Sequence, residues 1–206
     1  MGLFIPIEQV LEFANWCRRK EILFVLDESF VDFTDGYSEN SLLHDDILEN
    51  NPNMIVVKSI SKSYGVPGLR LGVMASSNTP YINYMKKDVS IWNINSFAEF
   101  YLQIFGKYQS DYDKACQKFI VERKRFAEQL SSIDFLRVIP SQANYFLCEV
   151  TKKFTSTELA KDLLNKYNIL IKDCQTKNGL QNKNYVRIAI RNKKENDRLI
   201  EVLNSL

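Results

Sequence analysis

The stretch Ser59-Ile60-Ser61-Lys62-Ser63-Tyr64-Gly65, with Gly68-Leu69-Arg70 just beyond it, combines one amine, several hydroxyls and one guanidinium in a short segment. Upstream, an apolar run over residues 22–26 ends in the acids Asp27-Glu28. Each piece alone has an ordinary explanation, because serine-rich tracts are usually exposed loops and acids after a strand often cap a helix. We interpret these residues together, because a chance origin would require every one of the ordinary explanations to hold at the same time.

Continuous apolar runs at residues 22–26, 54–57 and 71–75 contain many strand-forming residues. Runs without alternation predict strands of a parallel sheet that is buried on both faces. A helix before the first run, opening at Pro6, indicates α/β architecture. Ligands of open α/β sheets bind beyond the carboxyl ends of the strands. Asp27 and the Ser59–Lys62 tract both follow strands, so we expect them at that edge.

The rest of the chain predicts two regions joined by a long helix. Helices are expected over residues 79–87, 96–106 and 111–130, with Tyr112, Ala115, Cys116, Phe126 and Leu130 among the core positions of the last. After it we expect strands at 135–139, 145–150 and 185–190 and helices at 156–167 and 193–206. We therefore predict a boundary between residues 115 and 116, with a smaller α+β domain over 116–206.

Composition limits the possible functions. The 27 basic and 25 acidic side chains nearly cancel, which argues against nucleic-acid or membrane partners. We interpret the clusters at 18–20 and 123–125 as solvated helix faces. One histidine and four widely spaced cysteines give no metal-binding pattern, and no segment resembles a signal peptide or a membrane span. These features predict a reduced, cytoplasmic protein without a metal site.

The joint pattern resembles the cofactor site of fold-type I pyridoxal-phosphate (PLP) enzymes of the aminotransferase class I/II family. The resemblance implies that Lys62 forms a Schiff base with PLP, that Asp27 pairs with the pyridine nitrogen, and that Ser59, Ser61 and Arg70 hold the phosphate. It also implies a partial large domain, with a mostly parallel sheet, over residues 1–115. The expected assembly is a homodimer, and the expected substrate is an amino acid or a phosphorylated amino acid.

Further stretches extend the resemblance and favour one branch of the aminotransferase class I/II family. Asp27-Glu28-Ser29-Phe30 has phenylalanine where histidinol-phosphate aminotransferases and many other relatives have a tyrosine that bonds the cofactor. Trp92-Asn93-Ile94-Asn95 and the arginines Arg187 and Arg191 are similar to the threonine-phosphate decarboxylase branch. The resemblance assigns Arg187 to the substrate carboxylate. Arg191 is equally well explained as a phosphate contact or as a surface residue, and Asn144 as a substrate-side or a structural residue.

The chain lacks the family's Asn-Pro-x-Asn-Pro-(Thr/Ser)-Gly segment, of which Gly2 would be the remnant, and the earlier phosphate loop. We expect a carboxy-terminal portion of a longer enzyme. The leading hypothesis is an aminotransferase-type PLP enzyme. The alternatives are an L-threonine-O-3-phosphate decarboxylase-like activity and an inactive truncated fragment. A Rossmann-like nucleotide domain lacks its glycine motif.

Overall fold

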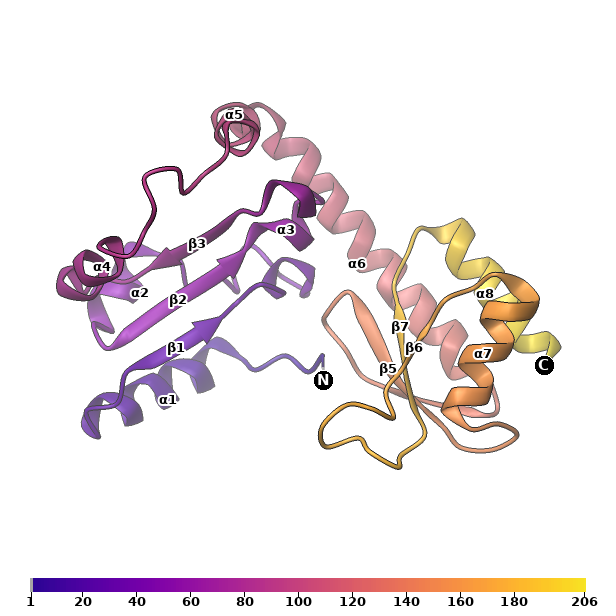
Figure 1. The fold of residues 1–206 in the computed structure, drawn as a ribbon. Coiled ribbons are helices and arrows are strands. Elements are labelled where there is room, and N and C mark those ends of the chain that lie inside the picture. Colours follow the sequence, from indigo (N-terminus) through magenta and orange to yellow (C-terminus); the bar gives the residue numbers. More distant parts are fainter. Residues whose placement is uncertain (1) are drawn as a thin grey trace. The chain divides into compact units, whose positions relative to one another are not determined.

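The computed structural model describes residues 2–206, and its contacts divide them into two compact units (Figure 1). One unit is Ile5–Cys116, and the other joins residues 2–4 to Gln117–Leu206. The predicted domain over 1–115 starts at Met1, which lies outside the described residues. No helix within residues 2–206 is long and apolar enough to cross a membrane.

The first unit is built on a sheet of three strands in the order β1 (Phe24–Asp27), β2 (Met54–Ser59) and β3 (Gly72–Ala75). β1 and β2 are parallel, with Asp27 opposite Val57. β3 is antiparallel to β2, with Gly72 opposite Ser59, so the prediction of parallel strands is wrong for β3. The connection after β2 returns the chain at the same sheet edge, whereas a parallel strand needs a crossover to the other end.

One face of this sheet carries the core of the unit. Helices α1 (Ile7–Arg19) and α2 (Asp45–Asn50) contribute to a cluster around Met54 and Val56 on β2. Val25 on β1 is 54% exposed and Val73 on β3 is 41% exposed. The prediction of burial on both faces is therefore wrong for the two outer strands, because residues 2–206 cover these side chains only in part.

Local signals define the remaining helices of the first unit. The side chains of Asn78 and Asn95 accept backbone hydrogen bonds at the starts of α4 (Thr79–Lys86) and α5 (Ser96–Phe105). α3 (Ile60–Ser63) and the 3-10 helices η1 (Val31–Phe33), η2 (Pro67–Leu69) and η3 (Gly106–Tyr108) are single turns. Sequence periodicity did not predict α2 or these single turns, because they are too short to show one.

The second unit is an antiparallel sheet with helices on one face. The strands run in the order β4 (Leu136–Ile139), β5 (Tyr145–Val150), β7 (Tyr185–Ala189) and β6 (Lys172–Asp173). α6 (Gln109–Ser131), α7 (Ser156–Tyr167) and α8 (Lys193–Ser205) supply the helical side of one apolar core, which includes Phe126, Phe146, Leu163, Ile188 and Leu203. The observed bounds match the predicted helices and strands of this region within one or two residues.

Two predictions about α6 are wrong. Ala115 was expected in the core and is exposed. Arg123 was expected on a solvated face and is only 3% exposed, and one of its guanidinium nitrogens donates to the Gln142 carbonyl at 3.4 Å. A long arginine side chain satisfied by a carbonyl can be buried, which residue type alone does not reveal. The basic residues 18–20 at the end of α1 are exposed, as predicted.

Candidate active site

A chain of hydrogen bonds joins the carboxyl ends of β1 and β2. Asp27 Oδ1 accepts from the Ser29 amide at 2.9 Å and from the Ser29 hydroxyl at 2.5 Å. Ser29 Oγ in turn accepts from the Ser59 amide at 2.8 Å. The sequence-predicted residues Asp27 and Ser59 are therefore brought together, through a serine that sequence reasoning missed. The sequence feature that could have identified Ser29 is its hydroxyl, two residues after the predicted Asp27.

Lys62 lies on α3, immediately after β2, and its side chain is exposed. Its ammonium nitrogen is 4.6 Å from the centroid of the Phe30 ring, a cation–π distance. The sequence identified Phe30 only as a residue without a hydroxyl. The structure shows that its ring face contacts the predicted Schiff-base lysine.

Ser61 and Arg70 are connected to this edge by backbone pairing. The Leu71 carbonyl accepts from the Ile60 amide at 3.2 Å and from the Ser61 hydroxyl at 3.5 Å. Arg70, the preceding residue, is exposed and has a left-handed backbone with φ of 59°. Non-glycine residues in this region are under modest strain and cluster at functional sites. One Arg70 guanidinium nitrogen donates to the Pro67 carbonyl at 3.3 Å.

The chemistry of this donor set fits PLP. Asp27 is exposed and, among residues 2–206, its second carboxylate oxygen has no hydrogen-bond donor, which suits a protonated ring nitrogen. The Lys62 amine is accessible to an aldehyde. The Ser59 hydroxyl and the Arg70 guanidinium can donate to a phosphate dianion, whereas Ser61 is buried and its hydroxyl donates to the Leu71 carbonyl.

An aromatic group packs next to the lysine turn. The Tyr64 ring stacks on Tyr112 with centroids 4.3 Å apart, and Phe105 contacts both rings. Burial, helped by the nearby charge of Asp32, raises the pKa of Tyr64 to about 12. The same two causes raise the pKa of Tyr112. These phenols therefore stay protonated at neutral pH.

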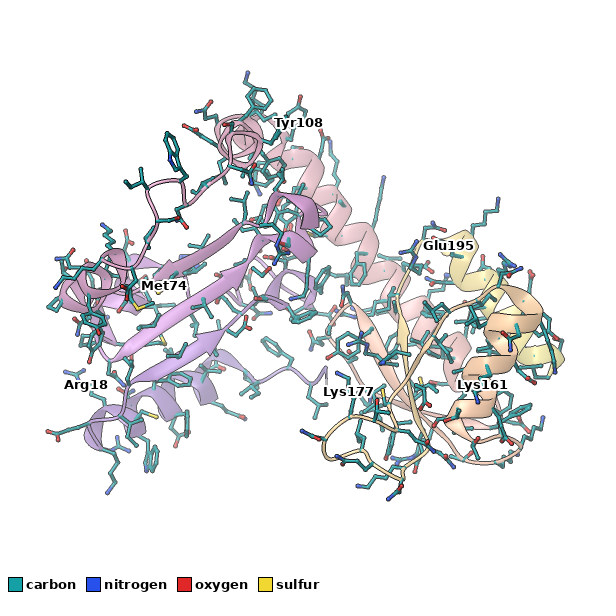
Figure 2. All side chains as sticks on the ribbon, viewed as in Figure 1. Arg18, Met74, Tyr108, Lys161, Lys177 and Glu195 are labelled. Atoms are coloured by element: carbon teal, nitrogen blue, oxygen red, sulfur yellow. The ribbon has the colours of Figure 1, made fainter. Side chains whose placement is uncertain are left out.

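The predicted substrate residues belong to the second unit. Arg187 lies on β7 and its guanidinium carbon is 5.1 Å from the centroid of the Tyr145 ring. The Asn144 carbonyl accepts from the Ile190 amide at 3.0 Å, so its backbone has a structural role. Arg191 is exposed and forms an ion pair at 3.0 Å with Glu195, which is labelled on α8 in Figure 2.

A model of the family described as "Aminotransferase class I and II" matches residues 1–203. The chain belongs to this family. Membership implies PLP as the cofactor, and the structural relatives carry the same fold, of which this chain holds a part. The parent proteins of this family are enzymes.

The relatives include decarboxylases and aminotransferases. The chain is 32% identical to the L-serine phosphate decarboxylase of Campylobacter jejuni, over 86% of this chain and 46% of the relative. It is 30% identical to the threonine-phosphate decarboxylase of Salmonella typhimurium, over 98% and 52%. The solved histidinol-phosphate aminotransferase of Clostridium acetobutylicum superposes with a TM-score of 0.86 at 28% identity, over 100% of this chain and 61% of that structure. The chain thus spans about half of these curated relatives.

Proposed function

We propose that this chain carries the lysine and phosphate side of the active site of a PLP-dependent aminotransferase-type enzyme that acts on an amino acid or a phosphorylated amino acid. The observation that carries the proposal is the bonded edge of the sheet, where the Ser29 hydroxyl links Asp27 to Ser59, one turn before Lys62. In this proposal the unit Ile5–Cys116 is part of the PLP-binding domain, and Gln117–Leu206 is the small domain.

When bound, PLP withdraws electrons from the alpha carbon of an attached amino acid. Asp27 accepts the ring N–H and holds its positive charge. Ser59 and Arg70 would bind the phosphate, with Ser61 joining them when its hydroxyl turns from the Leu71 carbonyl, and so would fix the position of the ring. The Lys62 amine would hold and move a proton at the substrate alpha carbon. Arg187 binds the substrate carboxylate, with Asn144 and Arg191 on the substrate side.

The test of the cofactor site is titration of the purified chain with PLP. We expect a visible absorbance band, and borohydride reduction followed by peptide mass spectrometry should find the pyridoxyl group on Lys62. Lys62→Ala should abolish both signals. Lys86→Ala removes an exposed lysine of α4 and is the matched control, which should behave as wild type. A band that survives in Lys62→Ala would contradict the proposal.

A second candidate reaction is decarboxylation of a phosphorylated amino acid. Phe30 favours it, because the aminotransferases of the resemblance carry tyrosine there, and two of the relatives above are named as phosphoamino-acid decarboxylases. Keto acid formation that requires an amino acceptor would support transamination. Carbon dioxide release without an acceptor, with a proton taking the place of the carboxylate, would support decarboxylation.

A third candidate is a chain that has no activity by itself. Asp27, Lys62 and Arg70 are all exposed, and Ile91 and Trp92 are 93% and 90% exposed. Such apolar surfaces commonly bind another polypeptide. An absence of any PLP band in wild type and in Lys86→Ala would favour this candidate.

By the same resemblance we propose a homodimer in the cytoplasm. The four cysteines are free and buried, which is compatible with a reducing compartment. Sedimentation of the purified chain tests the dimer, because a monomer at all concentrations would contradict it.

A further inference from the structure

Three charged side chains are buried together beside the candidate cofactor site. Lys58 Nζ lies 2.8 Å from Asp32 Oδ1 and 4.0 Å from Glu28 Oε1. The three residues are only 9%, 5% and 6% exposed. The Glu28 carboxylate also accepts hydrogen bonds from the Ser41 hydroxyl at 2.7 Å and from the Leu42 amide at 2.9 Å. The group is therefore a connected network and not an incidental surface pair.

Stability is a weak explanation for such a network. Removing several charges from water costs free energy that their attraction repays only in part, and apolar side chains of similar volume often stabilise a fold as well. Two acids facing one lysine also leave a net negative charge inside the unit. What the network supplies instead is a defined geometry, because one ammonium reaches both carboxylates, while Asp32 Oδ2 is buried without a hydrogen-bond partner among residues 2–206.

The network lies where geometry matters for the site. Glu28 directly follows Asp27, and its amide donates to the Val57 carbonyl at 2.9 Å. Asp32 belongs to η1, the turn that begins after Phe30. Lys58 precedes Ser59 in β2, and successive strand residues face opposite sides of the sheet. The ion pairs therefore fasten this turn to the strand from the side away from the Ser59 hydroxyl.

We propose that Lys58 is a positioning residue, whose contacts with Glu28 and Asp32 fix the turn after β1 against the end of β2. Asp27 is the last residue of β1 before that turn, and the end of β2 leads directly into Lys62. Without the ammonium, two carboxylates would lose their common partner, and within residues 2–206 only the Ser29–Ser59 and Glu28–Val57 hydrogen bonds would still hold this segment to β2. The expected effect on PLP binding rests on the proposed cofactor site, whereas the placement of the turn rests on the Lys58 ion pairs alone.

The test uses the full chain and two readouts. Lys58→Met keeps the length of the side chain and removes its charge. We expect faster hydrogen exchange in peptides covering residues 27–34 of the cofactor-free protein. We also expect about tenfold weaker PLP binding, the size of effect seen when the support of a ligating group is removed. Lys58→Arg keeps the charge and should restore both values.

The control separates positioning from simple loss of stability. Val56→Ala, in the buried centre of the same strand, should lower the unfolding midpoint without selectively increasing exchange in 27–34 or weakening PLP binding. The proposal is overturned if Lys58→Met and Val56→Ala, matched in unfolding midpoint, give equal exchange and PLP affinity, or if Lys58→Arg behaves like Lys58→Met.

A second variant, Asp32→Asn, and hydrogen exchange of the cofactor-free protein allow the proposal to be tested even if Lys58→Met does not fold or PLP does not bind. If Lys58→Met does not fold, Asp32→Asn replaces it, with the same expectation, and unchanged exchange and affinity in that variant would overturn the proposal. If the wild type binds no PLP, the proposed function fails while the exchange measurement still decides whether Lys58 positions the turn.

Discussion

At the scale of single residues, the contact between Lys62 and Phe30 is the most specific feature of the site. The ring face at 4.6 Å attracts the ammonium form of the lysine. A hydroxyl at position 30 would instead offer a polar contact to a cofactor. Phe30 thus acts on the lysine, whereas a tyrosine there would act on the cofactor as well.

Phe30→Leu removes the ring and keeps an apolar side chain. Since the cation–π contact stabilises the charged amine by about 0.5–1 kcal/mol, its loss should speed the reaction of Lys62 with pyridoxal about two- to fivefold at neutral pH. Stopped-flow absorbance measures the rate. A rate equal to or below that of wild type would show that the ring does not hold the ammonium, and Phe33→Leu, at the end of the same turn, serves as the control.

At the scale of elements, the residue that follows α3 packs against α5 and α6 in the aromatic group of Tyr64, Phe105 and Tyr112. The group anchors the turn that carries Lys62. The phenols add a dependence on pH, because burial disfavours their ionised forms. The pKa of Tyr64 is raised to about 12 from an ordinary 10.0.

Tyr64→Phe should change the response of stability to alkaline pH. Between about pH 10 and 12 the unfolded chain loses the Tyr64 proton and the folded chain keeps it, so stability that is complete below this window falls within it. Discounted for partial solvent access, the loss is about 1 kcal/mol, and Tyr64→Phe should be spared it. Urea unfolding near pH 8 and pH 11 measures the difference. Exposed Tyr84→Phe is the control, and an equal pH response in Tyr64→Phe and wild type would contradict the expectation.

At the scale of the whole molecule, the chain holds separate apolar cores. The core of the second unit includes three fully buried phenylalanines, Phe126, Phe135 and Phe146. The first unit has smaller clusters around Met54 and around Leu71. Both tryptophans, Trp16 and Trp92, belong to the first unit, so their fluorescence reports on that unit.

Phe146→Ala should destabilise the second unit by about 3–5 kcal/mol, because a buried ring leaves a cavity. We expect the unfolding midpoint measured by far-UV circular dichroism to fall more than the midpoint measured by tryptophan fluorescence. Met54→Ala, in the first unit, should reverse the order. Equal shifts of both signals in both variants would show that the two units unfold as one.

Much of the architecture followed from local patterns in the sequence. Residues 145–150 and 156–167 show clear periodicity, and their strand and helix have the predicted bounds. The family signature around Asp27 and Lys62 could likewise be identified from residue types and their spacing along the chain. Ser29 and Lys58 escaped sequence analysis because their importance arises from contacts with residues distant along the chain. The contact of Phe30 with Lys62 and the burial of Arg123 depend on distant partners in the same way.

The sequence by itself determined the order of the longer helices and strands, the family and the identity of the candidate lysine, since these depend on residue type and spacing. Only the tertiary structure decided that β3 runs antiparallel, that Ser29 links Asp27 to Ser59, and that Lys58 is buried between two acids. The physical reason is that strand direction, hydrogen-bond partners and the burial of charge depend on which distant segments meet, and spacing along the chain does not specify that.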